Sequence, residues 1–116
     1  MKIAIVGSRK IPPPNLEEYV SDCDEIVSGG AVGVDSYAAE FAKKKGLILT
    51  EFLPEYRRYG RGAPIIRNKR IVDYADKVIV FWDGKSKGSL SVIKYAERKG
   101  KECKVVICDP HNENQE

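Results

Sequence analysis

The chain has 116 residues, enough for one domain with a sizeable core, and its 42% hydrophobic and 32% charged residues are ordinary for a globular protein. A net charge of +3 is too small by itself to indicate a nucleic-acid partner. The three cysteines lack CxxC spacing and the only histidine is His111, so the sequence excludes the usual zinc sites and we predict no metal centre.

No stretch approaches the roughly 18 apolar residues that indicate a membrane-spanning helix, and the apolar start of the chain is too short for a signal peptide. Cys103 and Cys108 lie in or beside an apolar run and are predicted to be buried free thiols, which fits a reducing compartment. We therefore expect a cytoplasmic protein without a membrane partner. Residues 1–108 are predicted to form one domain, and residues 109–116, which have no apolar side chain to bury, a disordered tail.

Short apolar runs alternate with helical patterns along the chain. The run KIAIV is apolar after its first residue, as a strand buried on both faces should be. Within residues 34–45 the apolar positions recur at helical spacing, and Gly46 can close that helix. The predicted strands are residues 2–6, 25–27, 47–52, 77–82 and 103–108. The predicted helices are residues 15–22 with Asn15 as the cap, 34–45, 64–75 starting at Pro64, and 89–99.

Alternation of strands with helices predicts an α/β fold, a Rossmann-like three-layer sandwich with a five-stranded parallel sheet between helices. The first and fourth strands are the most apolar and should lie at the centre, which gives the order 3-2-1-4-5 with right-handed crossovers. In such sheets a ligand lies outside the carboxyl ends of the strands, where the strand order reverses. That point falls between the first and fourth strands. We therefore expect the functional residues in the loops that follow the strands.

Glycines follow the first two predicted strands. Gly7, Ser8 and Arg9 come directly after the first and bring a tight turn, a hydroxyl and a guanidinium to the reversal point. The stretch SGGAVGVD at residues 28–35 joins the second strand to a well-formed helix, whose start provides unpaired N–H donors for an anion. Its spacing is neither GxGxxG nor a P-loop. The predicted ligand-binding residues of this stretch are Ser28, Gly29, Gly30, Gly33 and Asp35.

Basic and polar residues near the third strand extend the predicted pocket. The segment from 54 to 62 holds three arginines and two tyrosines, and we select Arg61 as a counter-charge for phosphate. Arg67 and Asn68 lie in the next helix, where Asn68 heads an otherwise apolar stripe at the end nearest the ligand edge. A buried Asn needs hydrogen-bond partners, which neighbouring loops or a ligand would provide.

The loop after the fourth strand reads DGKSKGS from residue 83 onward. Ser86, Gly88 and Ser89 precede or begin a helix and are predicted to donate hydrogen bonds to an anion, with Ser89 as an alternative helix cap. This loop should face the glycine-rich stretch across the reversal point and complete a phosphate clamp. Asp83 belongs to the same predicted site.

Catalytic residues are less clearly indicated. A Ser/His/Asp triad is excluded because the only histidine lies in the tail, and GxSxG is absent. Asp35 and Asp83 are the candidate acid/base groups near the pocket. For Asp35 two interpretations stay equal, namely compensation of the helix dipole and a hydrogen bond to a ribose hydroxyl or a neighbouring loop.

Together these motifs resemble the SLOG superfamily, Rossmann-like domains named for the bacterial SMF/DprA and plant LOG proteins. The chain is most similar to the compact stand-alone bacterial branch near YspA and YpsA. The resemblance spans roughly residues 3 to 108 in the expected order. Its marks are Gly7-Ser8-Arg9, the stretch 28–35, Tyr59-Gly60-Arg61, Arg67-Asn68, Ala75-Asp76 and the stretch 81–88.

The resemblance implies a nucleotide-type ligand at the glycine-rich loops and does not imply one reaction. LOG enzymes cleave the N-glycosidic bond of nucleoside monophosphates with a PGGxGTxxE stretch, whereas this chain has SGGAVGVDSYA without a Glu in register. The chain is closer in this stretch to DprA, which binds single-stranded DNA. Other members are proposed sensors of nucleotide-derived signals, including signals derived from NAD.

We therefore predict a binding module or sensor for a nucleotide or ADP-ribose-type ligand, with no cofactor required. The alternatives are a nucleotide hydrolase and a single-stranded nucleic-acid binder that uses the arginines and tyrosines of residues 57–61. The sequence leaves open whether the chain forms a homo-oligomer.

Overall fold

The computed structural model describes residues 1–12, 14–20, 22–30 and 33–108. The tail predicted at 109–116 lies outside these described residues. Within them, no helix has the length and apolar character that crossing a membrane requires.

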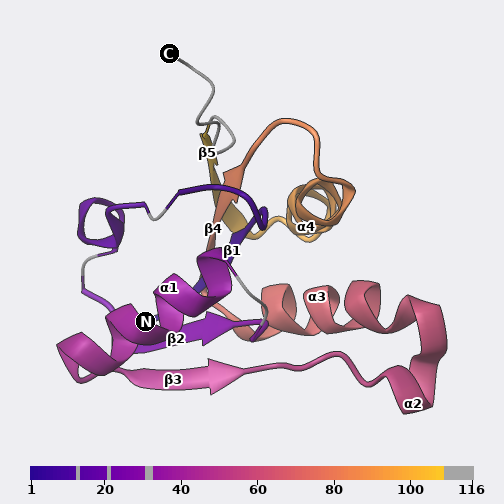
Figure 1. Ribbon diagram of the computed structural model, residues 1–116, viewed down its shortest axis with the longest axis horizontal. Coiled ribbons are helices and arrows are strands. Elements are labelled where there is room, and N and C mark those ends of the chain that lie inside the picture. Colours follow the sequence, from indigo (N-terminus) through magenta and orange to yellow (C-terminus); the bar gives the residue numbers. More distant parts are fainter. Residues whose placement is uncertain (13, 21, 31–32, 109–116) are drawn as a thin grey trace.

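A five-stranded sheet forms the centre of the molecule (Figure 1). All neighbouring strands are parallel, and their order β3-β2-β1-β4-β5 confirms the predicted α/β Rossmann-like fold. The strands β1 and β4 lie side by side at the centre, and β3 is an edge strand, as the predicted order requires. Their bounds are β1 (Lys2–Gly7), β2 (Glu25–Ser28), β3 (Ile48–Glu51), β4 (Lys77–Trp82) and β5 (Glu102–Ile107).

Three long helices connect the strands. They are α1 (Val34–Lys45), α3 (Ala63–Tyr74) and α4 (Lys87–Arg98). The helix α1 is capped by Gly46, which has a left-handed conformation with φ of 70°, as predicted. The helix α4 begins two residues before the predicted Ser89, because Ser86 and not Ser89 takes the capping position.

Two short segments differ from the sequence prediction. The helix expected at 15–22 is only a 3₁₀ turn, η1 (Leu16–Glu18), and the Asn15 side chain makes no capping hydrogen bond. The segment expected as an irregular loop contains a single helical turn, α2 (Tyr56–Tyr59), followed by the 3₁₀ turn η2 (Gly60–Gly62). Both are too short for apolar periodicity to reveal them.

Helices cover both faces of the sheet, and each face has its own apolar core. On one face α1 and η1 pack against alternate strand residues such as Ile5, Ile26 and Phe81. On the other face α3 and α4 pack against the intervening residues such as Ala4 and Val80. This alternation follows from the period of two in a strand, and the two cores hold the central strands rigidly beneath the loops at their carboxyl ends.

The cysteines are free thiols, but Cys103 and Cys108 are only half-buried, which corrects the prediction that both are buried. Cys103 lies in β5 and Cys108 follows it directly. β5 is an edge strand that pairs with β4 alone, so one side of it has no neighbouring strand to cover it.

Candidate functional site

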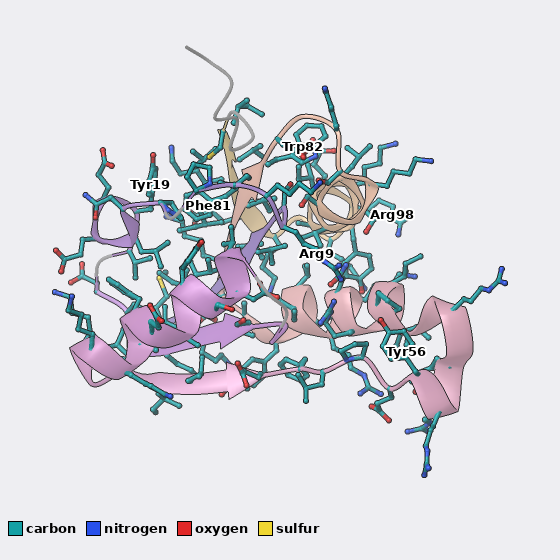
Figure 2. The ribbon with its side chains drawn as sticks, viewed as in Figure 1. Arg9, Tyr19, Tyr56, Phe81, Trp82 and Arg98 are labelled. Carbon is teal, nitrogen blue, oxygen red and sulfur yellow. The ribbon has the colours of Figure 1, made fainter. Side chains whose placement is uncertain are left out.

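A pocket of about 400 Å³ opens at the carboxyl ends of β1 and β4, where the strand order reverses. In Figure 2 the labelled Arg9 lies beside this pocket, between α3 and α4. Many residues predicted from the sequence line it. They are Gly7, Ser8, Arg9, Gly29, Asp35, Arg67, Asn68, Asp83, Ser86, Gly88 and Ser89.

A cluster of three serine hydroxyls lies at the junction of the β1 and β4 loops. The Ser86 and Ser8 Oγ atoms are 2.7 Å apart, and the Ser8 and Ser89 Oγ atoms are 3.4 Å apart. The backbone N–H of Asp83 also donates to the Ser8 Oγ, at 3.3 Å. Ser8 and Ser89 are each only 4% exposed. The cluster joins two loops that are distant in sequence and presents hydroxyl groups to the pocket.

Asp83 organises the turn between β4 and α4. Its Oδ1 accepts hydrogen bonds from the N–H groups of Lys85 and Ser86 at 2.9 and 2.8 Å, and from the Ser86 hydroxyl at 2.9 Å. The backbone N–H of Ser86 and then that of Lys85 lower the pKa of Asp83 from 3.8 to about 2. The group is therefore a carboxylate at neutral pH, and its geometry suits holding this turn better than donating a proton.

Protonation of Asp83 should weaken the fold in acid. Because its pKa is lower in the folded chain than its ordinary value, its contribution to stability is complete above pH 4 and is lost as the pH falls from about 4 to about 2. We expect the melting temperature of Asp83→Asn to lie below that of the wild type at pH 6, and the difference to shrink toward pH 2. Thermal unfolding across this range measures it, with Glu40→Gln correcting for the loss of one exposed negative charge. A constant difference would contradict this role.

The glycine-rich stretch closes one side of the site, but mostly through contacts within the protein. Gly30 and Gly33 have positive φ angles of 72° and 82°. A Cβ on Gly33 would lie 2.7 Å from the backbone oxygen of Arg9, so this glycine lets the β1 loop pass closely. The fully buried Ser28 accepts the N–H of Gly30 through its Oγ at 3.2 Å. Ser28, Gly30 and Gly33 therefore shape the loop and do not line the pocket.

Arg67 of α3 connects three segments around the pocket. Its Nη1 donates to the carbonyl oxygen of Gly29 at 2.7 Å and to that of Phe52 at 3.4 Å, while its Nε donates to the Asn68 Oδ1 at 2.8 Å. Carbonyl and amide oxygens leave the guanidinium charge uncompensated by these bonds. A Cβ on Gly29 would approach both this guanidinium and, at 3.0 Å, a carboxylate oxygen of Asp35. Only glycine fits between them without displacing one of the two.

The structure does not bring every predicted residue to the lining of the pocket. Arg61 is exposed in η2 and does not line the pocket, because residues 56–62 fold into two short turns before α3. Asn68 is half-buried at the pocket wall. Four lining residues were not predicted, of which Lys10 adds a further positive charge and could have been selected as the neighbour of Arg9. These are Val6, Lys10, Pro64 and Ile71.

Charged groups of both signs meet at the pocket. Arg9, Lys10 and Arg67 are basic and Asp35 and Asp83 acidic, with Asp83 already engaged in its turn. Among the described residues, no group of three or more histidine, cysteine, aspartate or glutamate side chains is arranged to hold a metal ion. The arrangement offers hydroxyl, N–H and cationic donors, which suit a phosphate or carboxylate.

Comparison with protein-family models, curated proteins and solved structures finds no match. Similarity to the SLOG superfamily therefore stays a prediction from the sequence motifs. The functional argument rests on the geometry of the pocket.

Proposed function

We propose that this chain binds a nucleotide or a nucleotide-derived phosphorylated ligand in the pocket at the carboxyl ends of β1 and β4. The observation that carries the proposal is the joined hydroxyl cluster of Ser8, Ser86 and Ser89 at the start of α4, inside a pocket with excess basic residues. In doubly wound sheets ligands bind at this reversal point.

A phosphate would be held by the first turn of α4. The N–H of Leu90 donates to the Ser86 carbonyl oxygen at 3.2 Å as the first bond of this helix, so the preceding amides have no acceptor within the helix. These amides and the positive end of the helix dipole favour an anion. Arg9 and Lys10, both exposed at the pocket, supply mobile counter-charges.

The size of the pocket fits a small ligand. Its volume of about 400 Å³ lies near the lower end of the roughly 300–1,000 Å³ typical of small-molecule sites. The apolar residues Val6, Pro64 and Ile71 also line the pocket, and such lining suits a base or sugar ring next to the phosphate. A mononucleotide has both parts, a base or sugar ring for the apolar residues and a phosphate for the polar site.

Thermal unfolding with AMP, ADP, ADP-ribose and NAD tests the proposal. A ligand at about 100 times its dissociation constant should stabilise the domain by about 2.7 kcal/mol, which raises the melting temperature by several degrees. An oligonucleotide in the same series tests the nucleic-acid alternative, whose binding should weaken steeply with salt. If no nucleotide changes the melting temperature, the proposed function is wrong.

Hydrolysis is the second outcome to measure with any ligand that binds. Asp35, which is 8% exposed and lies in the first turn of α1 at the pocket, is the second predicted acid/base candidate. Release of free base or phosphate that is lost in Asp35→Asn would make the chain a hydrolase. Binding without turnover supports a sensor or carrier.

A further inference from the structure

A second, basic groove lies between α3 and α4, adjoining the nucleotide pocket. It has a volume of about 250 Å³ and is lined by Ile65, Asn68 and Lys69 of α3 and by a stripe of α4. The stripe consists of Ser91, Lys94, Tyr95 and Arg98, which share one helix face because they follow the i, i+3, i+4, i+7 spacing. Figure 1 shows α3 and α4 next to each other.

Positive charges gather around one aromatic ring in this groove. The Nζ atoms of Lys69 and Lys99 and the Cζ of Arg98 each lie 5.6 Å from the centroid of the Tyr95 ring. Figure 2 shows Arg98 on the outer side of α4. Lys94 adds a further charge at the groove. An anion bound in the groove would lie near several of these positive charges and be attracted by them.

Carboxylates do not neutralise this cluster within the described residues. None of Lys69, Lys94, Arg98 and Lys99 forms an ion pair there. Asp73 is the acidic residue next to the Tyr95 ring. Its two carboxylate oxygens accept a hydrogen bond from the Tyr95 hydroxyl at 2.9 and 3.0 Å. That hydrogen bond holds the ring in place, and the three basic side chains that line the groove, Lys69, Lys94 and Arg98, outnumber this one carboxylate.

The groove adjoins the nucleotide pocket. Asn68 lines both of them. The hydroxyl of Ser91 in the groove donates at 2.9 Å to the carbonyl oxygen of Gly88, which lines the pocket. A ligand that extends beyond the pocket on the side of Asn68 would reach the basic side chains of the groove.

We propose that this groove is a second anion subsite, which binds a further phosphate group of the ligand held in the pocket. The inference rests on the proposed function and specifies its substrate class, namely nucleotides with at least one phosphate beyond the first. Lys94 and Arg98 provide the direct contacts from α4, and Lys69 from α3. A mononucleotide with a single phosphate fills the pocket and leaves the groove empty.

Binding of three probes to the full chain tests the inference. AMP has one phosphate, ATP extends it at the 5′ end, and adenosine 3′,5′-bisphosphate adds a phosphate on the other side of the ribose. At least one of the two longer probes should bind about tenfold more tightly than AMP, since charge-assisted hydrogen bonds contribute this much. The double variant Lys94→Gln/Arg98→Gln should remove that advantage and leave the affinity for AMP unchanged.

A matched control removes the same charge elsewhere. Lys43→Gln/Lys44→Gln deletes two exposed positive charges from α1, on the opposite face of the sheet, and should leave all three affinities as in the wild type. Equal binding of the three probes, or equal losses in the groove and control variants, would overturn the second subsite while leaving the nucleotide pocket intact. If no probe binds, the proposed function fails and the subsite fails with it.

Discussion

Gly88→Asp is expected to abolish binding of a phosphate-bearing ligand while the domain stays folded. Gly88 is the second residue of α4 and lines the pocket, and a Cβ added there would meet no atom within 4 Å. A carboxylate at this position would stand where we place the phosphate. Because like charges in contact cost several kcal/mol, affinity should fall by about a hundredfold or more. Isothermal titration with the tightest ligand of the nucleotide series measures the loss.

Gly88→Ala is the matched control for this variant. It adds a Cβ without charge, and replacing glycine in a helix should stabilise the domain by up to about 1 kcal/mol. Gly88→Asp should be at least as stable as the wild type too, since an acidic residue suits the first turn of a helix. Binding by Gly88→Asp at wild-type affinity would show that no anion lies at the start of α4.

Gly7→Ala is expected to destabilise the fold by about 1–3 kcal/mol and thus to lower the melting temperature by several degrees. Gly7 ends β1 directly beneath α1. An added Cβ would lie 2.5 to 2.8 Å from three atoms of the Val34 side chain, which is fully buried in the core. Because a branched side chain in a packed core has no free space to enter, α1 itself must shift.

A double-mutant cycle separates this contact from a general effect of the substitution. Val34→Ala alone should cost about 2 kcal/mol, because it removes buried methyl groups. It also removes two of the three atoms that the methyl group added by Gly7→Ala would meet, while the Cβ at 2.6 Å stays. The relief is therefore partial, and the double variant should be more stable than the sum of the two losses predicts by about 0.5 kcal/mol. Gly62→Ala is the control, since a Cβ there meets nothing within 4 Å. Additive losses in the cycle would mean that the two Val34 methyl groups do not oppose the added Cβ.

Apolar runs and turn residues were sufficient to predict the sheet and its order. The continuous apolar strands β1 and β4 could only be central, and right-handed crossovers then left one arrangement of the others. Segments without apolar periodicity could not be predicted from apolar runs and turn residues. In residues 15–22 only two apolar side chains among those described, Leu16 and Val20, are buried, which is too few to hold a longer helix against the sheet.

The candidate site was predictable where topology alone brings residues together. Ser8 and Ser86 follow neighbouring parallel strands, so their contact was foreseeable from the order of the strands. The structural reason for each glycine could not be predicted from the sequence. A glycine makes room for any close neighbour, and only the coordinates show that Gly33 admits the Arg9 backbone and Gly30 the side chain of Leu53. The position of Arg61 outside the pocket lining could not be predicted, because the sequence around it does not reveal the two short turns that precede α3.

The turn between β4 and α4, which Asp83 organises, is already held in place before a ligand binds. Three hydrogen bonds to one carboxylate oxygen, together with the serine cluster, fix this segment in the absence of a ligand. A ligand arriving at α4 does not have to order the chain around it, so little conformational entropy is lost in the protein on binding. Most of the intrinsic attraction for the phosphate is then retained as affinity. Discrimination between ligands is correspondingly left to their shape and charge, because a rigid pocket adapts little to a poor fit.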